Sequence, residues 1–452
     1  MPLRDIVFSI VWVGLLPVSL LRPWLGILAW YWLAYFVPHA HVYGFARSIP
    51  VAAGVGGATL VGFLFAHDRK PLPRSWVTFF MLAFSVDFTL TTILAYNPAL
   101  SFEKWNWVSK VLLMTFVTMS LFQDRARLRW LYMMPALGIG FYGFKGGIWV
   151  LVKGGGELVY GPDMSFYAGN NEIGLALCIV LPLLLYLSRE EERPWLKRIL
   201  QLTFALSIIS IIFTYSRGAF LGLLVILSVL IWRSPWRLRF ATAVILAALI
   251  AAPLAPQRIW DRLGSIGQQE SADTRDTSSA ARLEAWRTSW QLALDRPFTG
   301  GGFRALWNEE IWLRYYGQGF MNNFDAHSIY FEVLGEHGFL GFALYFGTIV
   351  AALTTLRRLR KRWRDDPEHK YISHYAEMLQ LALCPFLVAG AFVGVAYFDI
   401  YFLIVGTVAV LQQLSREAET ATVPAPVIKQ GSRLPARMKP LPSGSRRRTR
   451  HA

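Results

Sequence analysis

Apolar residues along this chain fall into runs that are long enough to cross a lipid bilayer, separated by short polar connections. A transmembrane helix needs about 20 predominantly apolar residues. The first run, residues 6–37, is interrupted by Arg22-Pro23 and is either one broken helix or two short ones. The later predicted spans are 49–66, 76–95, 105–122, 129–152, 172–188, 198–215, 218–232, 238–254, 328–352, 376–397 and 400–414. The pattern therefore predicts an all-α polytopic membrane protein with 12 or 13 transmembrane helices.

The composition agrees with a membrane protein and excludes several other classes. Hydrophobic residues make up 54% of the 452 residues and charged residues only 16%, whereas soluble domains carry roughly 25% charged residues. The two cysteines, Cys178 and Cys384, both lie in apolar runs, so the chain has neither a disulfide framework nor a zinc-binding spacing. The sequence also has no phosphate-binding loop for ATP and no acidic pair of the type Asp-x-Asp in an outer loop, so no cofactor or metal is expected.

The positive charge of the chain predicts its orientation in the membrane. Lys and Arg gather in alternate connections, namely Arg22 and residues 67–74, 124–129, 189–198, 233–239, 357–370 and 416–452. Together these segments are more positive than the net charge of +16, so the rest of the chain is slightly acidic. By the positive-inside rule this face is cytoplasmic, and the C-terminus lies there. The charge thus indicates contact with membrane lipids and gives no reason to expect a nucleic-acid partner.

This orientation divides the chain into four parts and places its longest connection outside. We expect an N-terminal transmembrane bundle (1–254), a large periplasmic loop (255–327), C-terminal transmembrane helices (328–415) and a disordered basic cytoplasmic tail (416–452). A loop of that length with its own helical pattern is typically functional. Ser278-Ser279 is expected to cap a helix that ends near Leu294. Arg282 and Arg287 flank the apolar stripe of that helix, which is Leu283, Trp286, Trp290 and Leu294.

Arg217 is the first candidate for chemistry. It stands in Tyr215-Ser216-Arg217-Gly218, at the outer end of a predicted span, with almost no linker before the next span. A charged side chain at membrane depth is costly and tends to face a cavity or a partner. The alternative is an arginine without a role in chemistry, whose long side chain only carries its charged group to the membrane–water interface.

His327 is the second candidate, because it stands where the large loop re-enters the membrane. Imidazole is the side chain best suited to accept a proton near neutral pH. If His327 and Ser328 lie on a helix, they share a side with Glu332, and His337 follows about three turns later. Glu332 and His337 are candidates to orient His327, with core packing as the equally open alternative.

Arginines outside the membrane suit the binding of phosphate. The positively charged residues of the 255–327 loop are all arginines, and Arg275, Arg287 and Arg304 join Arg282 as candidates. Guanidinium groups bind phosphate oxygens bidentately and can neutralise a pyrophosphate leaving group without a divalent ion. Asn170-Asn171 opens the span after the 153–171 loop; a turn and helix cap explain the pair best, and Asn171 is a weaker binding candidate.

At these residues the chain resembles the O-antigen ligase and O-antigen polymerase superfamily. His327-Ser328 and the later Gly338-Phe339-Leu340-Gly341 resemble the ligase pattern His-(Asn/Ser/Gln)-x9-Gly-x-x-Gly. Ser216-Arg217-Gly218 resembles the Ser-Arg-Gly element of the family. Arg282-Leu283-Glu284-Ala285-Trp286 and the Pro/Gly turn at 296–303 resemble its Arg-x-x-x-Trp helix and the turn that follows.

The resemblance implies a metal-independent, inverting glycosyltransferase of the bacterial inner membrane with its active site facing the periplasm. The donor would be a glycan linked to undecaprenyl pyrophosphate and the acceptor lipid A–core. Arg217 and Arg282 would bind the donor diphosphate, and His327 would be the general base. A polymerase or a protein O-oligosaccharyltransferase of the same superfamily is the first alternative, and a transporter or flippase of anionic lipids the second.

Overall fold

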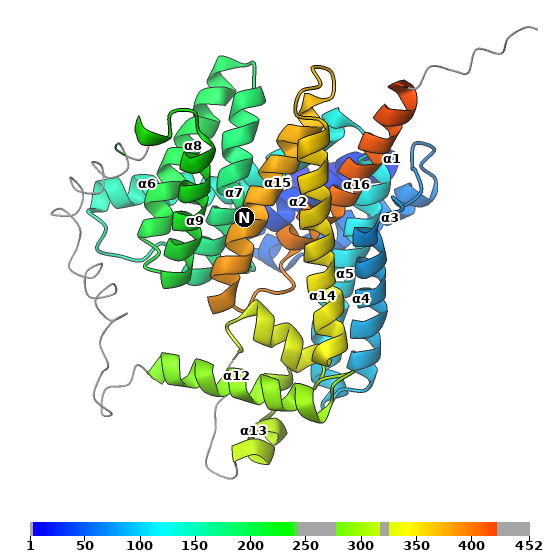
Figure 1. The fold of residues 1–452 in the computed structure, drawn as a ribbon, viewed down its shortest axis with the longest axis vertical. Coiled ribbons are helices and arrows are strands. Elements are labelled where there is room, and N and C mark those ends of the chain that lie inside the picture. Colours follow the sequence, from blue (N-terminus) through cyan, green and yellow to red (C-terminus); the bar gives the residue numbers. More distant parts are fainter. Residues whose placement is uncertain (1–2, 240–241, 243–276, 317–324, 423–452) are drawn as a thin grey trace, which may run out of the picture.

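Helices form the secondary structure of residues 3–239, 242, 277–316 and 325–422, which are the residues that this computed structural model describes (Figure 1). No strand occurs among them. The α-helices are α1 (Leu3–Leu21), α2 (Pro23–Phe36), α3 (Val51–Leu64), α4 (Trp76–Ile93), α5 (Pro98–Leu121), α6 (Arg125–Lys153), α7 (Asn170–Glu190), α8 (Pro194–Ile212), α9 (Arg217–Arg233), α12 (Thr277–Asp295), α13 (Glu309–Tyr316), α14 (Ile329–Arg362), α15 (Lys370–Ala389) and α16 (Asp399–Thr422). The short 3-10 helices are η1 (Pro38–His41), η2 (Phe45–Ser48), η4 (Ala305–Trp307) and η5 (Gly390–Phe392).

The prediction of an all-helical polytopic membrane protein is confirmed, but the predicted number of spans is not. Seven helices within the described residues are long and apolar enough to cross a membrane, namely α1, α4, α6, α7, α8, α14 and α15 extended through η5. The helices α5, α9 and α16 occupy predicted spans but are not among these seven. Most of the predicted span 238–254 lies outside the described residues. Arg22-Pro23 separates two helices, because Pro23 starts α2 at a position where its missing N–H costs nothing.

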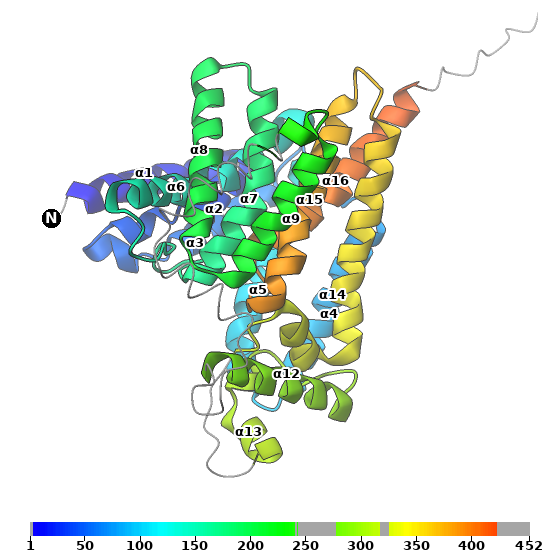
Figure 2. The same cartoon turned by 60° about the vertical axis from the view of Figure 1, so that its left-hand side comes forward.

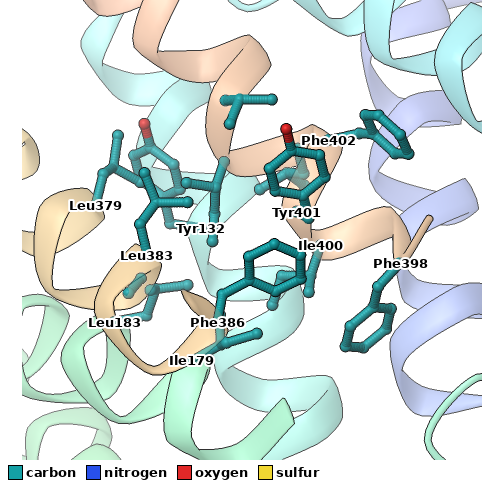
Figure 3. Close-up of a cluster of buried hydrophobic side chains, with 14 of the residues drawn as sticks. Tyr132, Ile179, Leu183, Leu379, Leu383, Phe386, Phe398, Ile400, Tyr401 and Phe402 are labelled. Atoms are coloured by element: carbon teal, nitrogen blue, oxygen red, sulfur yellow. The ribbon is translucent and has the colours of Figure 1, made fainter. Parts of the chain in front are cut away.

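Helix α7 lies at the centre of the bundle. Its residues from Ile173 to Leu184 are all buried, as expected for a helix that is apolar on every side. It packs against α6, α8, α9 and α15. Figure 3 shows where side chains of α6, α7, α15 and α16 meet, including the ring of Phe386 stacked on that of Tyr401 at 4.8 Å between centroids. Helices α1, α2 and α3 pack on one another around a second, smaller core (Figure 2).

The two ends of the bundle differ in character. At one end, here called the α12 end, α12 lies across the start of α14 (Figures 1 and 2). At the opposite end the basic connections of the sequence come together through ion pairs. Arg127 pairs with Asp68 at 2.6 Å, and Lys70 pairs with Glu417 at 3.2 Å. Three of the segments predicted to share one face of the membrane, 67–74, 124–129 and the start of 416–452, therefore meet at one end of the bundle.

Helix α12 differs in detail from the predicted loop helix. It begins at Thr277, so Ser278-Ser279 lies in its first turn and not before it. Its apolar stripe is only partly exposed: Leu283, Trp290 and Leu294 are exposed, whereas Trp286 is half-buried. Ala281, Ala285, Leu292 and Ala293 form the buried side instead. Small residues allow α12 to lie close to the start of α14.

Candidate functional site

His327 lies at the α12 end, in the connection that leads into α14. Its backbone has a φ of 45°, in the left-handed region, and Ser328 is the N-cap of α14. The condition under which His327 would share one side of a helix with Glu332 is therefore not met, because the chain turns at His327 before the helix starts. A left-handed histidine is uncommon and costs energy, and such residues gather at functional sites.

Helix α12 holds the His327 connection from one side. The indole Nε1 of Trp286 donates a hydrogen bond of 2.8 Å to the carbonyl oxygen of Ala326. The Trp286 ring also stacks on Phe331 at 4.9 Å between centroids. Arg282 precedes Trp286 by one helical turn, so both lie on the same side of α12. The half-buried Arg282 is therefore placed toward the His327 connection.

The 3-10 helix η5 links the same connection to Arg217. Arg217 is the first residue of α9, and the hydroxyl of Ser216 caps that helix by accepting a hydrogen bond of 3.3 Å from the backbone N–H of Ala219. A β-carbon at Gly218 would lie 3.3 Å from both the carbonyl oxygen of Ala389 and the Cβ of Phe392, at the two ends of η5. A β-carbon at Gly390 would lie 2.9 Å from the side chain of Ile329. The residue after Arg217 and the residue two positions after His327 thus both pack on one short segment.

The Asn170-Asn171 pair supports this arrangement from α7. Gly169 is the N-cap of α7, so the asparagines are its first two residues. The Asn170 amide Nδ2 donates a hydrogen bond of 2.9 Å to the carbonyl oxygen of Thr214. Asn170 thereby fixes the turn that precedes Arg217, while Asn171 is half-buried beside it.

Glu332 and His337 lie in the protein core. One carboxylate oxygen of Glu332 lies 3.6 Å from the Nζ of Lys104, and the other accepts a hydrogen bond of 3.0 Å from the backbone N–H of Ala396. The Nδ1 of His337 lies 2.7 Å from the hydroxyl of Thr91, and its ring packs on Phe303. Within the described residues no hydrogen bond or ion pair joins either side chain to His327. Core packing, the alternative from the sequence, is the arrangement observed.

Arg304 lines a cavity of about 640 Å³ at the α12 end. Its backbone is left-handed with a φ of 56°, and its guanidinium donates a hydrogen bond of 2.7 Å to Glu103. The cavity combines charged side chains with aromatic rings: Glu103, Lys104, Glu172, Arg304, Trp107, Phe166, Trp307, Tyr397 and Phe398. Such a mixture can surround a polar ligand that also has apolar faces.

The two remaining predicted arginines do not join this group. Arg287 is exposed on α12, between Leu283 and Leu294 on the side away from the buried alanines. Arg275 lies outside the described residues. No group of three or more His, Cys, Asp or Glu side chains that could hold a metal ion occurs in the described part of the chain.

The glycines of the turn after α12 and the glycines of α14, both part of the sequence motifs, pack against each other next to the site. Gly338 has a φ of 65° and a ψ of −167°, which kinks α14 and frees backbone groups on either side. The N–H groups of Gly301 and Gly302 donate hydrogen bonds of 2.9 Å to the carbonyl oxygens of Gly335 and Glu336. The kink therefore fastens the loop after α12 to α14.

We expect Gly338→Ala to destabilise the protein by about 2 kcal/mol or more, because only glycine readily adopts this backbone conformation. A β-carbon at this position would also lie 2.5 Å from the carbonyl oxygen of Pro297. Thermal unfolding in detergent, followed by tryptophan fluorescence, measures the effect. Gly57→Ala in α3 is the control, since nothing lies within 4 Å of its added carbon. Equal unfolding temperatures for the two variants would contradict the role of the kink.

Sequence patterns missed the side chains that α5 and the segment before α16 bring to the site. Lys104 lies near the rings of Trp107 and Tyr397, at 5.5 and 5.2 Å from their centroids. The hydroxyl of Tyr397 donates a hydrogen bond to Glu336. The adjacent charges of Glu103 and Lys104, directly before a predicted span, were the available signal. Nothing in the sequence indicated their partners, Arg304 and Glu332, which come more than 200 residues later.

Comparison with known proteins divides the chain into two matched regions. Residues 3–192 match a family of unknown function (DUF5935). No curated protein matches the chain. Residues 202–346 match the model of the family described as O-antigen ligase, and this region includes Arg217, Arg282, Arg304 and His327. The resemblance seen in the sequence motifs is thereby confirmed: residues 202–346 of this membrane protein are similar to the O-antigen ligase family.

Proposed function

We propose that this protein is an O-antigen ligase that transfers a glycan from undecaprenyl pyrophosphate to lipid A–core at the periplasmic face of the bacterial inner membrane. The observation that carries the proposal is the approach of two arginine-bearing helices to one histidine. Helix α12 holds Ala326 through Trp286, and α9 meets the start of α14 at η5. The α12 end is then the periplasmic end, and the basic opposite end, with the C-terminus, is cytoplasmic.

In this proposal Arg217 and Arg282 bind the donor diphosphate. Guanidinium groups neutralise the negative charge that builds up on the pyrophosphate as its bond to the sugar breaks. His327 takes the proton of the acceptor hydroxyl. The hydroxyl oxygen attacks the anomeric carbon from the face opposite the pyrophosphate, and the electron pair of the broken carbon–oxygen bond leaves with undecaprenyl pyrophosphate. The configuration at the anomeric carbon is inverted, and the chemistry requires neither a metal nor a cofactor.

The cavity beside Arg304 suits the glycan part of the substrates. The carboxylates of Glu103 and Glu172 can accept hydrogen bonds from sugar hydroxyls, and the rings of Trp107 and Trp307 offer faces for the C–H side of a pyranose. Arg304 is proposed here as a secondary contact to the diphosphate or the acceptor. Asn171, Arg287 and Arg275 are candidates for the same role with less support. Glu332 and His337 are proposed to act only through the packing beneath the site.

A transfer assay tests the proposal. The purified protein in lipid nanodiscs receives an undecaprenyl-pyrophosphate-linked glycan and lipid A–core, and gel electrophoresis of the lipid products reports the transfer. We expect a product that requires the core sugars and forms equally well with EDTA. Lipid A without core is the matched control acceptor. Longer glycans that form without any core would favour the polymerase instead. Absence of transfer to lipid, glycan and protein acceptors, or activity that only a divalent ion restores after EDTA, would contradict the proposal.

A further inference from the structure

A basic pocket lies at the end of the bundle opposite α12, far along α14 from His327. It has a volume of about 490 Å³ and opens between the last turn of α9, the last turns of α14 and the first turns of α15. Its cations are Arg233, Arg360, Arg364 and Lys370. We propose that this pocket binds a phosphate group, carried by the headgroup of an anionic phospholipid.

The charges of the pocket are only partly balanced by the protein. Arg233 pairs with Glu377 at 3.0 Å. Among the described residues, the guanidinium of Arg360 donates one side-chain hydrogen bond, of 3.4 Å, to the amide oxygen of Gln380. Arg364 and Lys370 form no ion pair with any side chain of the described residues. Four cations thus face two carboxylates, Glu377 and Asp365, and the surplus attracts an anion.

The side chains that surround the pocket favour phosphate over a smaller anion. Guanidinium groups present parallel N–H donors that match two oxygens of one phosphate group, and a lysine adds a mobile point charge. Arg233 and Arg360 are already held in place, because both donate to the same oxygen of Gln380 at 3.4 Å. The pocket is therefore partly organised before a ligand arrives, which lowers the entropy cost of binding.

The level of the pocket relative to the membrane indicates that the phosphate belongs to a lipid. Trp232, next to Arg233, has 79% of its surface exposed, and Trp236 and Trp195 are also exposed at this end. Tryptophans enriched in this way mark the level of lipid headgroups in a membrane. The guanidinium of Arg239 lies 4.1 Å from the centroid of the Trp236 ring. Basic pockets between membrane helices at this level are typical binding sites for phosphate headgroups.

Native mass spectrometry of the full-length protein in a neutral detergent tests the proposal by titration with phosphatidylglycerol or phosphatidylcholine. We expect clearly tighter binding of phosphatidylglycerol. The double variant Arg364→Ala/Lys370→Ala should bind it about 30-fold more weakly, from roughly fivefold for each cation near the surface. The matched control is Arg357→Ala/Arg358→Ala, which removes the same charge from exposed positions of α14 outside the pocket and should keep wild-type binding.

The other outcomes overturn the proposal. Equal binding of the two lipids, or equal loss in both double variants, would mean that the pocket makes no specific contact. Inorganic phosphate is titrated separately; if it binds as tightly as phosphatidylglycerol and displaces it, the ligand is free phosphate and the lipid assignment is wrong. The thermal unfolding of each variant is measured beside the wild type to confirm that the helices remain folded. Because lipid binding is read directly, the result does not depend on the proposed transferase activity.

Discussion

Replacement of His327 by alanine is expected to reduce glycan transfer at least 100-fold, since a positioned general base contributes about 10²–10⁴-fold to a rate. Without the imidazole, no side chain takes the proton of the acceptor hydroxyl as its oxygen attacks. His327 is half-buried, precedes α14 and makes no hydrogen bond within the described residues. The change should therefore leave the helices intact. Initial rates in the nanodisc assay, at equal amounts of folded protein, measure the effect.

Two further variants separate chemistry from backbone strain at this position. The φ of 45° at His327 is adopted by asparagine more readily than by alanine. His327→Asn should therefore be as inactive as His327→Ala while unfolding at the wild-type temperature. His67→Ala, at an exposed histidine outside the site, should be fully active. If His327→Asn transfers glycan at more than a tenth of the wild-type rate, His327 is not the general base.

The sequence predicts best those features that depend on local patterns. Apolar runs place the helices, and alternating basic connections show which helix ends share a face, as the pairing of Arg127 with Asp68 confirms. The family motifs lead to Arg217, Arg282 and His327 as candidates; the fold packs α12 against the start of α14 and joins α9 to it through η5. Local patterns suffice for such features because residues that are neighbours along one helix are also neighbours in space.

Local patterns fail where backbone conformation or a distant partner decides the structure. An uninterrupted helix fits the hydropathy of residues 328–352, yet a positive φ angle at Gly338 kinks it, and a second positive φ angle, at His327, turns the chain just before it starts. The hydropathy of a segment carries no information on the φ angle of a single residue, because a change in backbone direction leaves the side chains the same. The placement of Glu332 likewise depends on Lys104, more than 200 residues earlier. A carboxylate next to a candidate base in sequence thus proved to be the partner of a lysine on another helix.

Lys104→Met is expected to destabilise the protein by about 3 kcal/mol, because it leaves the carboxylate of Glu332 buried without its cation. The side chain of Glu332 is 4% exposed and that of Lys104 is 22% exposed, and Nζ lies 3.6 Å from Oε1. The methionine keeps the length and apolar stem of lysine, so the packing against Trp107 and Tyr397 changes little. Thermal and chemical unfolding in detergent measure the loss.

A double-mutant cycle identifies the buried pair as the cause. Glu332→Gln removes the unpaired charge and keeps an oxygen that accepts the N–H of Ala396, so Lys104→Met/Glu332→Gln should recover most of the lost stability. Lys70→Met is the matched control; its partner Glu417 is 42% exposed, and an exposed pair contributes about 1 kcal/mol or less. If Lys104→Met costs no more than Lys70→Met, or if the double variant is the least stable, the pair does not hold α5 to α14.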